Sequence, residues 1–194
     1  MKMLNVLFGI KNYVPYDCYE TIFDIDYQKL YQSGKRVILI DIDNTIIPYD
    51  FDLPKEEHLK LISEIKKIGF QVIFLSNNHQ ERVKKIAQAF GVEAIYSACK
   101  PLKKGFRQAL KLATFSSKKE VVTIGDQIMT DVLGSNRSDL EAILVKPIKR
   151  KNEKWYTKLN RKIENRIVRR MNKNYPEIVE KIRELRGETV ENKM

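Results

Sequence analysis

The chain has 194 residues, of which 43% are hydrophobic, so an α/β domain with an appendage can bury a core without disulfide support. Its two cysteines, Cys18 and Cys99, form no CxxC pair. That argues against a zinc site or a disulfide scaffold and favours a reducing cytosol. No apolar run is long enough to span a bilayer, so we expect no membrane-spanning helix.

Apolar spacing along the chain predicts strands that alternate with helices. The expected strands are residues 37–40, 71–75, 94–96, 121–124 and 142–145. The expected helices are residues 26–33, 54–68, 80–90, 102–113 and 130–136. Such alternation is typical of an α/β protein with a Rossmann-like parallel sheet, here of about five strands, flanked by helices.

The net charge of +11 is concentrated near the C-terminus. Residues 149–173 contain eleven Lys or Arg and two Glu, which leaves the rest of the chain nearly neutral. In the same segment, apolar residues recur at every fourth position from Trp155 to Met171, which predicts an amphipathic helix. We therefore divide the chain into an N-terminal segment that packs on the core (1–34), a core (35–148) and a basic helical extension (149–194).

Two aspartates follow the most apolar of the expected strands. Asp41 and Asp43 lie two residues apart, so on an extended backbone their side chains point to the same side. In open α/β sheets, ligands bind at the carboxyl ends of the strands. Two carboxylates at one spot repel each other, and a hard cation such as Mg²⁺ relieves that repulsion. A solvated acidic turn is the simpler alternative.

Further polar residues stand where later strands are expected to end. These are Ser76, Lys100-Pro101, Gly125-Asp126 and Asp131. In this order, and after Asp41-x-Asp43-x-Thr45, they resemble the four-motif signature of the haloacid dehalogenase-like (HAD) phosphatases. The resemblance covers residues 37–147 and is to subclass IIIA. Flanking residues 23–27 and 131–137 resemble its YqeG-type branch, which is related to the mitochondrial phosphatidylglycerophosphatases.

The resemblance implies a Rossmann-like HAD fold without a cap domain, and a role for each matching residue. Asp41 would be the nucleophile that forms an aspartyl phosphate, and Asp43 the general acid and base. The residues expected to bind the phosphate are Thr45, whose hydroxyl would also steady Asp43, Ser76 and Lys100. The residues expected to hold Mg²⁺ are Asp41, Asp43 through its backbone carbonyl, Asp126 and Asp131. Further candidate pocket residues are Asn44, Asn77 and Asn78.

Several residues also suit roles that involve no chemistry. Ser76 suits a turn or a helix cap, and Asp131 suits the first turn of a helix. We expect His79 to begin a helix, His58 to lie on the surface, and Cys99 to be buried and inert.

The spacing of the motifs leaves no room for a cap domain. One expected helix fills most of the chain between Thr45 and Ser76, and one helix and one strand lie between Asn78 and Lys100. HAD enzymes that act on small metabolites usually carry a cap. The resemblance therefore implies an open site and a phosphomonoester that is large or lipid-borne.

The basic extension bears on the same question. An apolar stripe flanked by cations, with Trp155 at its start, is typical of a membrane-surface helix. The residues expected to contact an anionic membrane are Trp155, Lys158, Arg161, Arg166 and Arg169. The preferred hypothesis is a Mg²⁺-dependent phosphatidylglycerophosphate phosphatase that is cytoplasmic and peripheral on the inner face of the membrane. The stripe equally suits packing on the chain's own core.

Two other functions remain open. One is a phosphatase that acts on nucleic acid ends or on phosphoproteins. The other is an RNA- or ribosome-associated basic module with a vestigial site, whose binding would weaken steeply with salt. The basic segment lacks interleaved aromatic residues, so base stacking is poorly supported.

Overall fold

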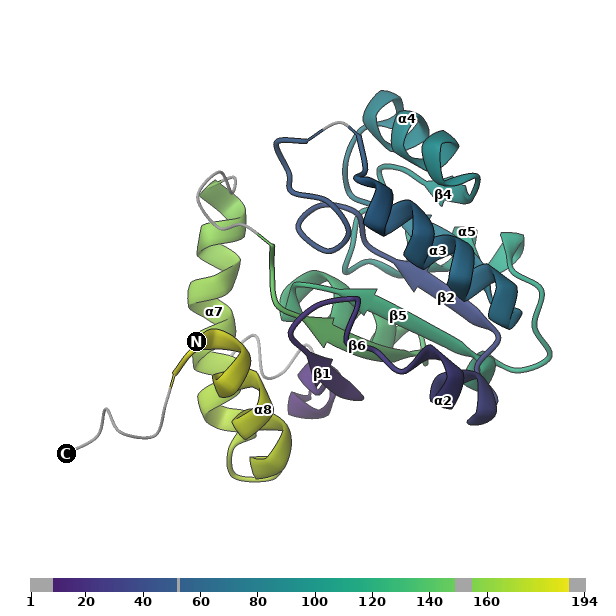
Figure 1. Cartoon of the computed structure of the whole chain (residues 1–194). Coiled ribbons are helices and arrows are strands. Elements are labelled where there is room, and N and C mark those ends of the chain that lie inside the picture. The colour runs from purple at the N-terminus through teal and green to yellow at the C-terminus, as the bar shows by residue number, and fades with distance from the viewer. Residues whose placement is uncertain (1–8, 52, 149–154, 189–194) are drawn as a thin grey trace.

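The computed structural model describes residues 9–51, 53–148 and 155–188, with side chains described from Ile163 onward in the last range. Within these residues, six parallel strands form one sheet in the order β1-β6-β5-β2-β3-β4 (Figure 1). The strands are β1 (Asp17–Tyr19), β2 (Val37–Ile40), β3 (Gln71–Leu75), β4 (Glu93–Ile95), β5 (Val121–Gly125) and β6 (Glu141–Val145).

Helices connect the strands and cover both faces of the sheet. The α-helices are α2 (Tyr27–Gln32), α3 (Glu56–Ile68), α4 (Gln80–Phe90), α5 (Lys103–Leu112), α6 (Leu133–Arg137), α7 (Trp155–Met171) and α8 (Pro176–Arg186). The shorter turns are the 3₁₀-helices η1 (Ile10–Tyr13) and η2 (Lys118–Glu120) and the π-helix η3 (Ile128–Val132). Buried side chains place α2, α3 and α4 on one face and α5 on the other.

Strand β2 lies in the middle of the sheet because its four residues are all apolar and all buried. Its alternate side chains point to opposite faces. Ile38 and Ile40 pack with α2, α3 and α4, whereas Val37 and Leu39 pack with Phe106 and other residues of α5. A strand covered on both faces reads as a continuous apolar run, which is why the sequence pattern predicted it.

The predicted α/β class is confirmed, but the sheet has six strands where about five were expected. The additional strand is β1, which pairs with β6 through the register Cys18 to Leu144. It is short and only half-buried, so it lacks the apolar run that marks the inner strands. The N-terminal segment therefore supplies one of the two edge strands of the sheet, and β4 is the other.

Two expectations for single residues are wrong. His58 is buried, not on the surface, and its ring lies 5.3 Å from that of Phe23. Burial lowers the pKa of His58, against the opposing charge of Glu57. Cys99 is exposed, not buried, and stands in the loop after β4. His79 does begin a helix, as the N-cap of α4.

The apolar stripe of α7 packs on the core over the part whose side chains are described. Ile167, Val168 and Met171 are buried against η1, η3 and β6 together with residues of α8. Glu164 is also buried, and it accepts a hydrogen bond from the Met129 backbone at 3.1 Å. Of the two alternatives for the stripe, packing on the chain's own core is the one observed here.

Over the part of α7 whose side chains are described, the basic residues lie on the surface. Arg166 and Arg169 are exposed, while the side chains of Trp155, Lys158 and Arg161 lie outside the described residues. Among the helices that the structure describes, none combines the length and apolar character needed to cross a membrane.

The packing of α7 generates a first prediction. Met171→Ala should lower the free energy of unfolding by about 2–5 kcal/mol, because it removes a fully buried side chain between α7 and the core. Arg169→Ala, two residues away on the exposed face, is the matched control and should change stability by less than about 0.5 kcal/mol. Urea unfolding measures both. Equal, small effects would show that α7 does not pack as described.

Candidate active site

The polar residues after the strands meet at one edge of the sheet. All strands are parallel, so their carboxyl ends share an edge. Strand β2 lies between β3 and β5, which brings Asp41 next to Ser76 on one side and Asp126 on the other. The Asp41 backbone N–H donates to the Ile124 carbonyl at 2.9 Å and so holds Asp41 in register with β5.

A buried lysine bridges two of these carboxylates. The Lys100 ammonium nitrogen lies 2.6 Å from Oδ1 of Asp41 and 2.6 Å from Oδ1 of Asp131, and all three side chains are buried. Burial opposes the charge on Lys100, but the carboxylates of Asp131 and Asp41 outweigh it and raise the pKa of Lys100. Lys100 therefore stays protonated and holds the loop after β4 against the ends of β2 and β5.

Asp126 completes a cluster of three buried carboxylates. Oxygens of Asp41, Asp126 and Asp131 lie within 4.8 Å of one another. If all three are ionised, they and Lys100 sum to a charge of −2. Burial, followed by the nearby charges of Asp131 and Asp126, raises the pKa of Asp41 well above its ordinary value against the effect of Lys100. Carboxylate oxygens are the ligands that Mg²⁺ prefers, so the donor set and its charge fit a divalent cation.

Asp131 is held in place by its own turn and by a glycine. Its Oδ2 accepts hydrogen bonds from the Gln127 backbone and the Thr130 hydroxyl, each at 3.1 Å. Gly125 lies directly beneath it, and a Cβ added there would stand 2.3 Å from Cγ of Asp131. A glycine at the end of β5 is thus needed for Asp131 to approach the other carboxylates.

Asp43 belongs to a separate group of contacts. Its Oδ1 accepts from Nε and Nη2 of Arg82 at 3.1 and 2.9 Å. Its Oδ2 accepts from the Asn78 amide at 3.2 Å and from the Ser76 hydroxyl at 3.4 Å. Asp43 and Asp41, although two residues apart, therefore have different cations as partners: Arg82 and Lys100.

The other expected site residues position the loops. The Thr45 hydroxyl donates to Oδ2 of Asp41 at 3.4 Å, not to Asp43 as expected. Asn44 has a positive φ of 64°, and its side chain accepts from the Tyr49 backbone. Asn77 pairs with both backbone polar groups of Lys100, at 2.7 and 3.1 Å, and so fixes where that lysine emerges.

Arg82 was missed by the sequence analysis. It is the third residue of α4 and has charged residues around it in the sequence. Nothing in the local pattern distinguishes it from a cation on the surface of the helix. One available signal was electrostatic: Asp43, close to Asp41, needs a cation of its own. A cation in the first turn of α4, the helix that follows β3, lies close enough to the strand ends to be that partner.

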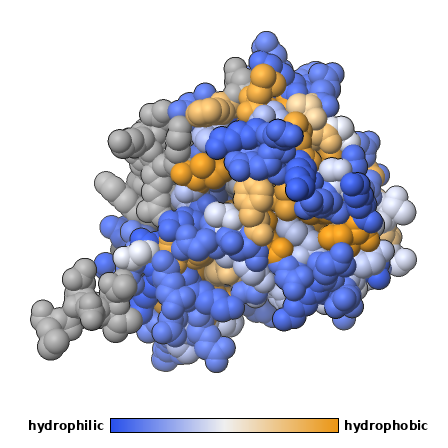
Figure 2. All heavy atoms as spheres, in the orientation of Figure 1, coloured by the Kyte–Doolittle hydropathy of each residue, from blue (hydrophilic) through white to orange (hydrophobic). Residues whose placement is uncertain are grey.

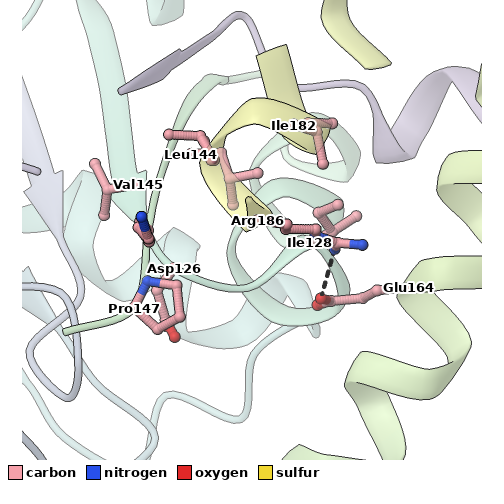
Figure 3. A pocket seen from close by; sticks show the side chains of 10 residues that line it. Asp126, Ile128, Leu144, Val145, Pro147, Glu164, Ile182 and Arg186 are labelled. Carbon is pink, nitrogen blue, oxygen red and sulfur yellow. Dashed lines mark hydrogen bonds and ion pairs between the residues drawn. The ribbon is translucent and has the colours of Figure 1, made fainter. Parts of the chain in front are cut away.

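A small hollow behind Asp126 connects the site to the C-terminal helices (Figure 3). Leu144, Val145 and Pro147 line one side of it, and residues of α7 and α8 line the other. Arg186 of α8 lies 3.5 Å from Glu164 of α7, in the ion pair drawn in the figure. The C-terminal helices therefore buttress the segment that carries Asp126 and Asp131.

Comparisons with known proteins identify the family. A family model of the haloacid dehalogenase-like hydrolases matches residues 7–139. The chain therefore belongs to the haloacid dehalogenase-like hydrolases. Within them it is a phosphatase of the YqeG type. It is 35% identical over 158 residues to the probable phosphatase YqeG of Bacillus subtilis (strain 168). The aligned residues cover 81% of this chain and 91% of that protein.

Two further similarities are more distant. A copper-transporting ATPase of Helicobacter pylori is 30% identical over 95 residues, which are 49% of this chain but only 12% of the ATPase. The structure of the HAD-hydrolase YfnB of Bacillus subtilis, bound to magnesium, matches with a TM-score of 0.50 and 14% identity. That match covers 61% of this chain and 90% of YfnB, and it concerns the fold alone. The expected family is confirmed.

The contact between Gly125 and Asp131 generates the second prediction. Gly125→Ala should destabilise the fold by about 1–3 kcal/mol, because the new methyl group overlaps Cγ of Asp131. Gly9→Ala is the control, since its added Cβ meets nothing within 4 Å. Urea unfolding compares the two variants. If Gly125→Ala were as stable as the parent, the close approach of Asp131 to β5 would be refuted.

Proposed function

We propose that the chain is a Mg²⁺-dependent phosphomonoesterase that acts through an aspartyl phosphate on a large, lipid-borne substrate. The observation that carries this proposal is the buried cluster of Asp41, Asp126 and Asp131 around the ammonium of Lys100. With all three carboxylates ionised, its net charge of −2 suits one divalent cation, and the Asp41 carboxylate can then attack a phosphoryl group.

Asp41 is the nucleophile in this proposal. One of its oxygens attacks phosphorus, the alcohol leaves, and Asp41 is left as an acyl phosphate. Lys100 and Thr45 already contact its two carboxylate oxygens, at 2.6 and 3.4 Å, and so orient the carboxylate. The Lys100 ammonium also offsets the negative charge that grows on the phosphoryl oxygens, with Ser76 as a further donor.

Asp43 is the general acid and base in this proposal. It gives a proton to the departing alkoxide oxygen, and in the second step it accepts one from the water that attacks the acyl phosphate. Water then releases inorganic phosphate and restores the Asp41 carboxylate. Arg82 and Asn78 hold the Asp43 carboxylate in the same orientation during both steps.

The residues that would hold Mg²⁺ are Asp41, Asp126 and Asp131, with the Asp43 backbone carbonyl as the fourth ligand implied by the family resemblance. When bound, the ion supplies positive charge beside the phosphoryl oxygens and offsets the repulsion among the carboxylates. The magnesium bound to YfnB, a protein of the same fold, supports this assignment.

The connections around the site favour a large substrate. The described residues between β2 and β3 form a loop and α3, and those between β3 and β5 form α4, β4, α5 and η2. None of these segments covers the strand ends as a further domain. Such an open edge suits a phosphate that protrudes from a larger body.

Exposed apolar side chains near the site support a lipid-borne phosphate. Phe51 and Leu53 follow β2, and Tyr96 and Leu102 follow β4, all at the edge of the sheet where the site lies. Figure 2 shows apolar side chains reaching the surface among charged ones on the face in view. The substrate we propose is phosphatidylglycerophosphate, an anionic lipid with a terminal phosphomonoester. The protein would bind it as a peripheral protein at the inner face of the membrane.

The nucleophile assignment gives the third prediction. Asp41→Asn should lower Mg²⁺-dependent release of phosphate from para-nitrophenyl phosphate by roughly 10³-fold or more, since the amide cannot form the acyl phosphate. Asp139→Asn, an exposed aspartate distant in sequence, is the control and should retain the parent rate. EDTA should abolish activity and added Mg²⁺ restore it. Unchanged turnover by Asp41→Asn would exclude the proposed mechanism.

The substrate assignment gives the fourth prediction. The parent should show its highest kcat/KM on phosphatidylglycerophosphate in mixed micelles, because an open site can reach a headgroup at a surface. A phosphopeptide and a 5′-phosphorylated oligonucleotide, assayed at the same Mg²⁺ concentration, are the competing substrates. Faster hydrolysis of either would replace the lipid by a phosphoprotein or a nucleic acid end and would leave the phosphatase chemistry intact.

A further inference from the structure

Glu164 of α7 is a buried carboxylate in a segment that is otherwise basic. Its side chain is 1% exposed, and residues 149–173 contain one other acid among eleven cations. Burying a carboxylate costs free energy unless hydrogen bonds or cations replace the water that it loses. The reason for an acid at this position must therefore lie in its contacts.

The two oxygens of Glu164 contact different elements of the fold. Oε1 accepts a hydrogen bond from the Met129 backbone N–H at 3.1 Å, and Oε2 lies 3.5 Å from Nη2 of Arg186. Nη1 of the same arginine donates to Oδ1 of Asn165 at 2.6 Å, so Arg186 also ties α8 to α7. The contacts of Glu164 thus join both C-terminal helices to η3, the π-helix that follows β5.

The Met129 N–H belongs to the first turn of a helix. Such N–H groups have no carbonyl within the helix to donate to, and a side chain before the helix usually caps them. Here the preceding residue, Gln127, makes no side-chain cap bond. Glu164 supplies the acceptor from another helix, 35 residues further along the chain. Because η3 runs directly into α6, the carboxylate also stands at the positive end of a longer helical run.

The turn that Glu164 caps carries Asp131. Met129 and Asp131 are two residues apart in η3, and Oδ2 of Asp131 accepts from the Gln127 N–H at 3.1 Å. Its Oδ1 accepts from Lys100 at 2.6 Å. A displacement of this turn would therefore move the Asp131 carboxylate relative to the other carboxylates of the cluster.

Glu164 lies behind the carboxylate cluster and is not one of its members. Among the described residues, the carboxylates that are close enough to share a cation belong to Asp41, Asp126 and Asp131. Glu164 and Asp126 line the same hollow of about 20 Å³, which is room for about one water molecule (Figure 3). Any effect of Glu164 on a bound cation therefore acts through the backbone of η3.

We propose that Glu164 is a positioning residue for the metal site. It caps the turn that carries Asp131, and it thereby makes the C-terminal extension a part of the apparatus that binds the divalent cation. The inference rests on the proposed Mg²⁺-dependent function. It assigns to α7 a role in metal binding, so that removing the cap weakens the binding of Mg²⁺ although no ligand is lost.

The test compares Glu164→Leu with Glu164→Gln. Both variants remove the negative charge beside Arg186, but the glutamine alone keeps an oxygen that can accept from the Met129 N–H. Isothermal titration of the full chain with MgCl₂ measures the Kd. It should be about tenfold higher for Glu164→Leu than for the parent, the low end of the effect of groups that hold metal ligands in place. Glu164→Gln should stay within about twofold of the parent, because the cap bond is retained.

Amide hydrogen exchange of Met129 provides a second readout that needs no metal. In the metal-free protein, this amide should exchange at least about tenfold faster in Glu164→Leu than in the parent, and at close to the parent rate in Glu164→Gln. Met171→Ala controls for a general loss of packing, since it removes a buried side chain of the same helix and keeps Glu164. It should lower stability and leave the Kd for Mg²⁺ unchanged.

A further variant covers the case in which Glu164→Leu does not fold. Glu164→Asp keeps the charge, but its side chain is shorter by one methylene and draws the acceptor away from Met129. It should also weaken the binding of Mg²⁺. An aspartate variant that binds Mg²⁺ as tightly as the parent would contradict the proposed cap.

The outcomes separate this inference from the function on which it rests. A parent that binds Mg²⁺ while Glu164→Leu binds it equally well overturns the positioning role and leaves the metal-dependent phosphatase standing. Equal weakening in the leucine and glutamine variants also overturns it, because charge and not the cap bond would then be the cause. Weakening in Met171→Ala does so too, as a packing effect. A parent that neither binds Mg²⁺ nor hydrolyses para-nitrophenyl phosphate overturns the proposed function itself.

Discussion

The ammonium of Lys100, held between Asp41 and Asp131, is the interaction on which the rest of the site depends. It joins three segments that are distant in sequence: the end of β2, the loop after β4 and the π-helix after β5. Removing one partner from a buried ion pair of this kind typically costs roughly 3–5 kcal/mol, because the other charge is left uncompensated. The parallel sheet supplies the common edge, and Lys100 fixes how the loops meet there.

Separation of charge follows from this arrangement. Asp41 shares a cluster of three carboxylates with one lysine, whereas Asp43 accepts from Arg82 on one oxygen and from Asn78 and Ser76 on the other. Two carboxylates on one strand end thus experience different surroundings. Pairs of titratable groups in different surroundings are how active sites assign distinct roles to the same residue type. Here the cluster in which carboxylates outnumber cations is the one suited to a metal, and the carboxylate paired with a cation is the one suited to transferring a proton.

Much of this was predictable from local patterns. The continuous apolar run of β2 and the polar residues after successive strands predicted the fold, the family and the edge where the site lies. Contacts that depend on three-dimensional approach were not predictable. Arg82 looks like any surface cation of α4, Thr45 turns to Asp41 where Asp43 was expected, and β1 is too short to leave a pattern. In each case tertiary geometry decided among partners that the sequence made equally available.

The apolar stripe of α7 is another feature for which the sequence left two partners open. Its packing changes how the protein could bind a membrane. Apolar residues at every fourth position fit a helix on a bilayer and a helix on a protein core equally well. Ile167, Val168 and Met171 are buried against the core, so this part of the stripe is not available to lipid. What α7 presents outward there is charge, from Arg166 and Arg169. Attraction of exposed cations to an anionic surface weakens with salt, whereas apolar insertion does not. The apolar side chains that remain exposed after β2 and β4 stand at the edge of the site itself, so any insertion by the described residues would bring the site toward the bilayer.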